Sequence, residues 1–251
     1  MEVHHHSRTS DTDIHRGRKK WTHYLWEFFM LFLAVSLGFL TENLREEYQD
    51  SHRVNAFMCK ISNDLQADIS EIGLLKQERI KRNLICDSLI ILLLDKPISG
   101  DRNKIYYFGR NATRRIHFRP QNATLQQLKN TGDLRLVKDN DLLDAINQYE
   151  QLLKFNEENV MVEEKELSEI SQLAAKIFDA SEFQKMTINN TIDHPTGNPG
   201  LFSYDKALLN EICVKLHYWK RTSVSVLESF DHLKKDAESL LTLVTQTYHC
   251  K

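Results

Sequence analysis

Residues 24–40 read YLWEFFMLFLAVSLGFL, an apolar run in which Glu27 is the single charged residue. A helix of this length covers about 25 Å, which is close to the roughly 30 Å hydrocarbon core of a bilayer. The flanking Trp21 and Thr41 extend the run on both sides. The sequence therefore predicts a membrane-spanning anchor over residues 21–41.

Two other interpretations exist for an apolar run at this position. A cleaved signal peptide has a shorter apolar region that ends in small residues, and Ser36 and Gly38 resemble such an ending. The run continues through Phe39 and Leu40, however, and then passes into a polar stretch that favours helix. The buried helix of a soluble protein rarely follows directly on a basic cluster. The sequence therefore favours an uncleaved anchor.

Basic residues are distributed unequally about the anchor. Two cations, Arg45 and Arg53, lie in residues 41–55 after it, and four lie directly before it: Arg16, Arg18, Lys19 and Lys20. Because positive charge stays on the cytoplasmic side, we expect residues 1–20 to form a disordered cytoplasmic tail and residues 42–251 to form an extracytoplasmic domain. In a bacterium this places the chain in the inner membrane and the domain in the periplasm.

Three later stretches repeat apolar residues at alternating spacings of three and four, so that one face of a helix becomes apolar. We call these faces seams. The first has eight apolar positions of eleven and comprises Met58, Ile61, Leu65, Asp68, Ile72, Leu75, Arg79, Arg82, Cys86, Leu89 and Leu93. The second has nine and comprises Leu142, Ile146, Tyr149, Leu153, Asn156, Val160, Glu163, Leu167, Ile170, Ala174 and Ile177. The third has ten and comprises Leu209, Ile212, Leu216, Trp219, Ser223, Val226, Phe230, Leu233, Ala237, Leu240 and Val244.

The seams predict an all-α fold in which the anchor helix continues into an elongated antiparallel bundle of three long helices and a short one. On this interpretation the second long helix returns toward the membrane and the third leads away again. Asn156 is a polar core residue of the kind that fixes register. The expected helix limits are a stop at Lys96 and Pro97, a short helix from Thr124 as N-cap to near Gly132, a long helix from Asp139 to Phe183, and a last helix capped by Ser203.

Residues 98–122 are the least regular part of the chain, and we expect a loop with short helical or extended pieces. Arginines alternate with aromatic residues here, a pattern that would suit an anionic ligand or phospholipid headgroups. The candidate residues are Arg110, Arg114, Arg115 and Arg119. A solvated connector whose aromatic residues cover the end of the bundle is the alternative.

The four cysteines, Cys59, Cys86, Cys213 and Cys250, allow three pairings, and spacing alone does not choose among them. One or two disulfides are compatible with an oxidising periplasm. Cys59 and Cys86 lie on or near the first seam, so that a buried free thiol is an equal expectation for them.

Composition and motifs indicate a binding or structural role. Charged residues are 27% and the net charge is −2, which gives no electrostatic basis for binding nucleic acid. The sequence lacks the recurrent serine, phosphate-loop, zinc and thiol motifs of enzymes, so we expect no catalytic activity, no cofactor and no metal site, the run of His4, His5 and His6 included.

Two functions remain. The first is a structural or interaction role for an anchored bundle. Ala34 and Gly38 form a small-x-x-x-small pair, a pattern through which membrane helices associate. The partner would be a second copy of the chain, in a homo-oligomer, or another envelope protein. The second is a sensory or small-ligand-binding domain that acts through a membrane partner.

Two blocks resemble one family. They are WEFFMLFLAVSLGFLTENLREEYQDSHRVNAFMCKISNDLQADI and, later, TLQQLKNTGDLRLVKDNDLLDAINQYEQL. They are similar to a family of uncharacterised single-pass membrane proteins found mainly in the Bacteroidota, which shares a polar step after the anchor (here Glu42 and Asn43), an LKxxGxLxLI-like element (here 128–137) and a tyrosine-bearing helix (here Tyr149). The resemblance implies an envelope location and a helical ectodomain, and it implies no reaction.

Overall fold

The computed structural model describes residues 16–95, 98, 100–189 and 191–250. Most of the expected disordered tail, the three N-terminal histidines and the expected helix stop at Lys96 and Pro97 lie outside these residues. The chain divides into two compact units, Met1–Arg53 and Val54–Lys251. Helix α1 (Arg16–Leu94) begins in the first unit, so residues 16–20 are helical although we expected them in the tail.

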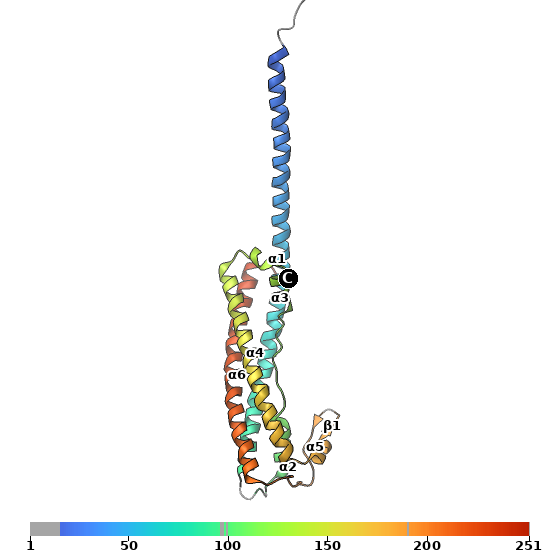
Figure 1. The fold of residues 1–251 in the computed structure, drawn as a ribbon, viewed down its shortest axis with the longest axis vertical. Coiled ribbons are helices and arrows are strands. Elements are labelled where there is room, and N and C mark those ends of the chain that lie inside the picture. The colour runs from blue at the N-terminus through green and yellow to red at the C-terminus, as the bar shows by residue number, and fades with distance from the viewer. Residues whose placement is uncertain (1–15, 96–97, 99, 190, 251) are drawn as a thin grey trace, which may run out of the picture. The chain divides into compact units, whose positions relative to one another are not determined.

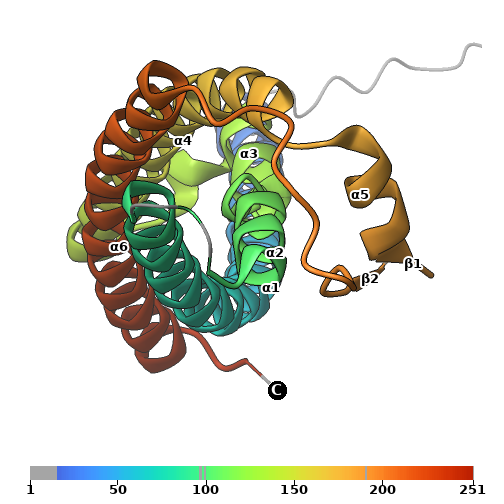
Figure 2. The same ribbon diagram turned by 90° about the horizontal axis from the view of Figure 1, so that it is seen from below.

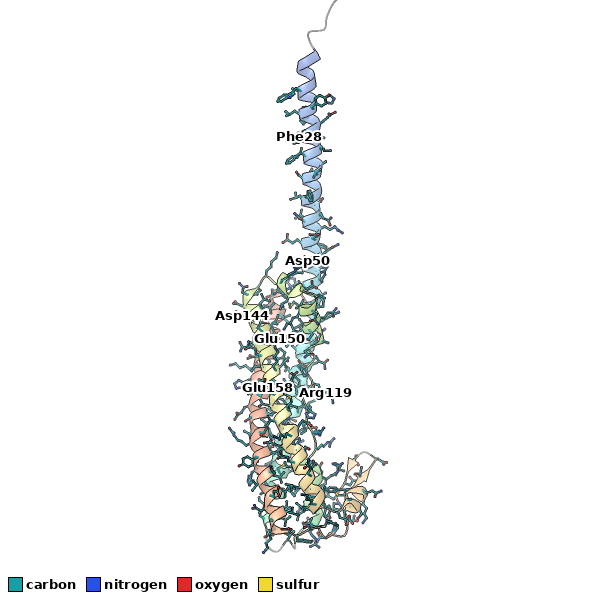
Figure 3. All side chains as sticks on the ribbon, viewed as in Figure 1. Phe28, Asp50, Arg119, Asp144, Glu150 and Glu158 are labelled. Carbon is teal, nitrogen blue, oxygen red and sulfur yellow. A yellow bond between two sulfur atoms is a disulfide. The ribbon has the colours of Figure 1, made fainter. Side chains whose placement is uncertain are left out.

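In the first unit, α1 carries the apolar run with all its side chains exposed. Leu31 and Phe39 are each 69% exposed, and Phe28 projects away from the helix axis (Figure 3). This is the one helix in the described part of the chain that is long and apolar enough to cross a membrane. Apolar side chains on every face of a helix require an apolar surrounding, which the described residues do not supply here.

The second unit is all-α apart from a β-hairpin whose two strands have two residues each (Figure 1). Its elements after α1 are α2 (Arg102–Ala112), α3 (Ala123–Asn130), the 3-10 turn η1 (Asp133–Leu136), α4 (Asn140–Ile177), α5 (Ala180–Met186), β1 (Thr187–Ile188), β2 (Thr191–Ile192) and α6 (Lys206–Thr247). Viewed along the bundle, α1, α4, α6 and the segment that carries α2 and α3 surround a common interior, and α5 with the hairpin lies outside this ring (Figure 2). The predicted all-α bundle is confirmed.

The long helices do not follow the expected up-down-up path. Contacts between α1 and α4 pair Asp68 with Tyr149 and Arg79 with Glu163, so that residue numbers rise together and the two helices run parallel. Contacts between α1 and α6 pair Lys76 with Asp231 and Asp87 with Lys220, so that α6 runs antiparallel to α1. The colour gradients in Figure 1 show the same directions. The return between α1 and α4 is made by the segment that contains α2 and α3.

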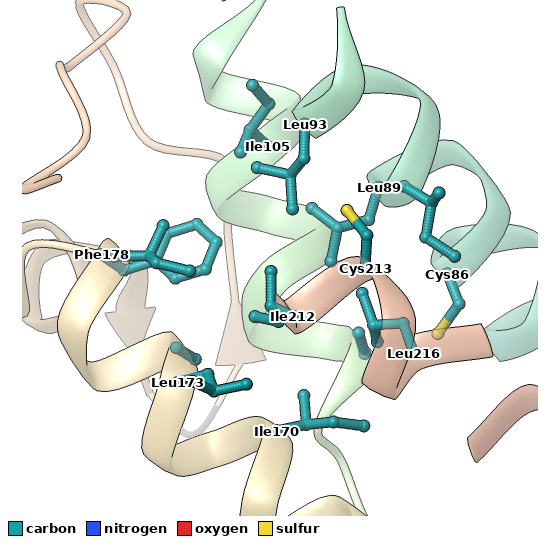
Figure 4. Packing of buried hydrophobic residues seen from close by; sticks show 14 of the residues in the cluster. Cys86, Leu89, Leu93, Ile105, Ile170, Leu173, Phe178, Ile212, Cys213 and Leu216 are labelled. Carbon is teal, nitrogen blue, oxygen red and sulfur yellow. The ribbon is translucent and has the colours of Figure 1, made fainter. Parts of the chain in front are cut away.

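The three seams are buried as predicted. Of their thirty-three positions, only Leu75 and Val160 are half-buried, and the remaining positions are buried. The interior forms two hydrophobic clusters. The entry cluster lies where α1 enters the unit and contains parts of 54–72, 142–153 and 226–244. The far cluster contains parts of 86–93, 167–178 and 209–219 and also Ile105 and Tyr106 of α2. Figure 4 shows Ile105 beside Leu93 at this end of the bundle.

Several helix ends differ from expectation. Asp139 caps α4 as predicted and accepts a hydrogen bond from the Leu142 amide at 3.2 Å. The first residue of α3 follows Asn122, not Thr124, because the Asn122 carbonyl already accepts from the Gln126 amide. Asp205, not Ser203, caps α6, because its carboxylate accepts from the Ala207 amide at 2.7 Å.

Helix α4 ends at Ile177, six residues before the expected limit at Phe183. Phe178 turns to an extended backbone and places its ring against α2, where a Cβ at Gly109 would lie 2.3 Å from the ring. Tyr106 of α2 binds the chain just after α4 and the chain that leads to α6. Its hydroxyl accepts a hydrogen bond from the Asp179 amide at 3.1 Å and donates one to the Gly200 carbonyl at 2.8 Å. Burial of Phe178 in the far cluster therefore ends the helix.

Cys59 and Cys250 form a disulfide across 191 residues of sequence, whereas Cys86 and Cys213 are buried free thiols. Of the two thiols expected near the first seam, Cys86 is buried and free and Cys59 is bonded. The bridge holds the end of the chain beside the entry cluster. The third long helix was expected to lead away from the entry of α1, and this expectation was wrong, because α6 is followed by a cysteine that is bonded to Cys59 near that entry.

Candidate functional site

Between the two hydrophobic clusters lies a polar layer that all three long helices contribute to. Its buried residues are Arg79, Arg82 and Asn83 of α1, Asn156 and Glu163 of α4, and Ser223 and Ser229 of α6. On each helix the layer occupies the turns between residues of the entry cluster and residues of the far cluster, except for Ser229, which lies between Val226 and Phe230 of the entry cluster. Buried polar groups carry a large desolvation cost unless they are paired, so the pairing within this layer decides its effect.

Glu163 is the centre of the layer. Both of its oxygens accept hydrogen bonds from the Arg79 guanidinium at 2.7 Å, and its Oε1 also accepts from Arg82 Nη2 at 2.8 Å. The side chains of Arg79, Arg82 and Glu163 are 0%, 3% and 1% exposed, respectively. Two-pronged guanidinium–carboxylate contacts of this kind are strong and fix geometry.

The irregular segment after α2 completes the arginine contacts. Arg79 also donates to the Ile116 carbonyl at 2.7 Å, and Arg82 donates to the Arg114 carbonyl. The chain between α2 and α3 therefore lies against the layer and supplies it with backbone acceptors. This explains why a segment without helical periodicity is held in place along the bundle.

Two aromatic rings of α6 face the guanidiniums. The Arg82 Cζ atom lies 4.5 Å from the Trp219 ring centroid, and the Arg79 Cζ atom lies 5.3 Å from the Phe230 ring centroid. Burial lowers the pKa of Arg82 to about 10, against the opposing effect of Glu163. Arg82 therefore stays cationic at neutral pH, and the layer holds two cations against one carboxylate.

Several buried atoms of the layer have no protein partner among the described residues. They are Nε of Arg79 and of Arg82, Oδ1 of Asn83 and of Asn156, Oγ of Ser223 and of Ser229, and the neighbouring Trp219 Nε1. Native interiors rarely leave such groups without water or a ligand. The layer is thus a place where a small polar species would gain hydrogen bonds.

A second buried polar contact lies in the entry cluster. The Asp68 carboxylate accepts from the Tyr149 hydroxyl and from the Gln121 amide, each at 2.8 Å. Burial raises the pKa of Asp68 although both hydrogen bonds oppose this, and burial together with Asp68 raises the pKa of Tyr149. This contact joins α1, α4 and the segment before α3.

We expect Asp68→Asn to change how stability depends on pH. The folded chain holds the Asp68 proton more tightly than the unfolded chain, so the wild type loses stability as the pH rises above 3.8 toward the raised folded pKa. The asparagine variant lacks this loss. Urea unfolding at several pH values should therefore show the wild type losing stability relative to the variant as pH rises.

Asp144→Asn is the control for that comparison, because it removes one carboxylate from an exposed position of α4. Figure 3 labels Asp144 on this helix. Parallel pH profiles for the wild type and Asp68→Asn would contradict the effect that we assign to burial.

The four arginines that we singled out in residues 98–122 do not share one site. The Arg110 guanidinium lies 6.0 Å from the Phe183 ring centroid, and Arg115 pairs with Glu164 of α4 at 3.2 Å. Arg114 and Arg119 are exposed. Arg114 takes part in the buried polar layer through its carbonyl, not its side chain.

Ala34 and Gly38 of the first unit are exposed on α1, and a Cβ added at Gly38 would meet nothing within 4 Å. They are therefore accessible to another helix, and their association remains a prediction. No group of three or more His, Cys, Asp or Glu residues that could hold a metal ion occurs in the described residues.

A pocket of about 660 Å³ lies at the far end of the bundle, between the end of α1 and the first turns of α6. Its lining is mainly apolar with a few polar groups, and comprises Leu93, Leu94, Asp95, Ile98, Tyr204, Lys206, Leu209 and Asn210. This size falls within the range of small-molecule sites.

Sequence reasoning missed the polar layer because it treated Arg79 and Arg82 as interruptions of an apolar seam. A signal was present, since Glu163 is an acidic residue on the seam of another helix and its charge complements theirs. Buried charges are almost always paired, so opposite charges on two seams predict contact between them. Comparisons of this chain with protein-family models, with curated proteins and with solved structures find no match.

Proposed function

We propose that this chain is a single-pass membrane-anchored helical-bundle protein of the bacterial envelope, with a structural or protein-interaction role. The observation that carries the proposal is the helix over residues 21–41, whose apolar side chains are exposed on every face. Exposed apolar area of this extent is stable in a lipid bilayer and unstable in water.

The disulfide supports an extracytoplasmic location for the bundle. Disulfides such as Cys59–Cys250 persist in oxidising compartments and are rare in a reducing cytoplasm. The cations at residues 16–20 support a cytoplasmic N-terminus. The resemblance to single-pass membrane proteins of the Bacteroidota agrees with the inner membrane and a periplasmic domain.

The partners that we propose are the lipid bilayer and either a second copy or another envelope protein. Ala34 and Gly38 would allow close approach of two membrane helices, because small side chains let backbones pack tightly. We propose no nucleic-acid partner, no cofactor and no enzymatic activity.

The topology is tested by thiol labelling of intact spheroplasts with a membrane-impermeant maleimide. After reduction, Cys59 and Cys250 should react, because the bridge is opened and the bundle faces outward. Without reductant the native chain should not react, since its remaining thiols are buried. A cysteine introduced by Ser10→Cys should stay protected until the cells are lysed.

A chain with Cys59→Ser and Cys250→Ser is the matched control and should not be labelled with or without reductant. Labelling of the Ser10→Cys chain before lysis, with Cys59 and Cys250 protected, would place the bundle in the cytoplasm. That result would overturn both the topology and the location proposed for the disulfide.

The pocket at the far end of the bundle favours a second candidate function, a small-ligand-binding domain that acts through a membrane partner. Leu93 and Leu209 contribute apolar lining, and Lys206 and Asn210 supply polar groups. A small molecule that raises the Tm of the wild type but not of Leu94→Trp, which fills the pocket, would favour this function over the first.

A further inference from the structure

The polar layer carries an uncompensated positive charge. Arg79 and Arg82 are both cationic and both bind Glu163, which is the one acidic side chain paired with either guanidinium in the described residues. Two positive charges and one negative charge leave an excess of one positive charge. Since the three side chains are at most 3% exposed, water outside the protein compensates this charge poorly.

Among the described atoms of the layer without a protein partner, three are N–H donors and two are hydroxyls that can donate, and they lie on the facing helices α1 and α6; the other two, Oδ1 of Asn83 and of Asn156, are acceptors. Arg82 Nε and Trp219 Nε1 belong to side chains in direct contact, because the guanidinium lies over the indole ring. Ser223 Oγ follows Trp219 by one helical turn on the same seam and precedes Phe230, which faces Arg79. Along α6, Ser223 therefore lies between the two residues whose rings face the guanidiniums.

We propose that the polar layer binds one small monovalent anion of the chloride type, held by Arg82 Nε–H, Trp219 Nε1–H and the Ser223 hydroxyl. One negative charge balances the layer, whereas a divalent anion would reverse the imbalance. The anion is small because hydrophobic clusters close the layer at both ends. Binding gives hydrogen-bond acceptors to three buried donors that would otherwise lack them.

The test uses the full-length chain in detergent and compares the Tm in sodium chloride with the Tm in sodium gluconate at equal ionic strength. Gluconate is too large for a closed layer, so that it serves as the non-binding anion. The Tm should rise with chloride and then saturate, by about 5 °C or more once chloride exceeds its Kd by about 100-fold. Bromide should substitute for chloride.

Three variants locate the effect. Arg82→Gln removes the excess charge, and its Tm should be the same in chloride and in gluconate. Ser223→Ala removes one donor with little change of volume and should need more chloride for the same rise, which provides a test even if Arg82→Gln does not fold. Arg115→Gln removes the same charge from a side chain that is 62% exposed, and it should keep the wild-type response.

Two outcomes would overturn the proposal. An equal wild-type Tm in chloride and in gluconate would mean that water alone occupies the layer. An equal chloride response in the wild type, Ser223→Ala and, if it folds, Arg82→Gln would mean that chloride acts elsewhere on the protein.

Discussion

Glu163→Gln is expected to destabilise the bundle by roughly 3–5 kcal/mol, because it leaves two buried guanidiniums without a carboxylate. Glutamine keeps the volume of Glu163 and one carbonyl acceptor, so that the loss reports charge and hydrogen bonding more than packing. Total stabilities of domains are commonly about 5–15 kcal/mol, so this loss is a large fraction. Urea unfolding followed by circular dichroism should show a lower midpoint.

The matched control is Glu157→Gln, which makes the same change at an exposed position of α4. We expect it to alter the free energy of unfolding by less than about 0.5 kcal/mol. If the two variants unfold at the same urea concentration, the ion pairs of Glu163 do not stabilise the fold as the geometry indicates.

Leu233→Asp is expected to unfold the bundle. Leu233 is fully buried in the entry cluster, and an aspartate there would lose the apolar contacts of leucine and bury a charge without a partner. Each effect costs several kcal/mol, and their sum approaches the whole stability of a domain. Circular dichroism at 222 nm should show the loss of helix from the second unit.

Lys234→Ala tests the same turn of α6 on its exposed face. Lys234 makes a 3.8 Å pair with Glu238, and its side chain is 43% exposed. Exposed pairs of this kind contribute little, so we expect a change within about 0.5 kcal/mol. Similar melting of Leu233→Asp and Lys234→Ala would contradict the assignment of the third seam to the core.

The sequence predicted which helix faces are buried, but it did not predict the direction of each helix. Apolar residues at alternating spacings of three and four give the same pattern when the helix is read from either end. The seams therefore show which face of each helix is buried, but they do not show whether two helices run parallel or antiparallel. Direction depended on residues 98–136, which are long enough to run back along the bundle. This segment is fixed by contacts of its backbone, such as the Ile116 carbonyl with Arg79, and such contacts leave no periodic pattern.

The polar layer shows a related limit. A hydropathy pattern is read along one helix at a time. It therefore shows Arg79 and Glu163 only as polar positions in two separate apolar seams and does not relate one to the other. Their contact requires α1 and α4 to run parallel at one register. The antiparallel path that we expected would have placed these residues differently, so the buried ion pairs could not be derived before the direction of α4 was known.

The disulfide turns the chain from Cys59 to Cys250 into a closed covalent ring. A protease that cuts the connection between α4 and α6 would open the ring at one point, but it would release no fragment, because α6 stays joined to α1 through the two sulfur atoms. Shedding of α6 from a cut chain therefore requires reduction as well as proteolysis.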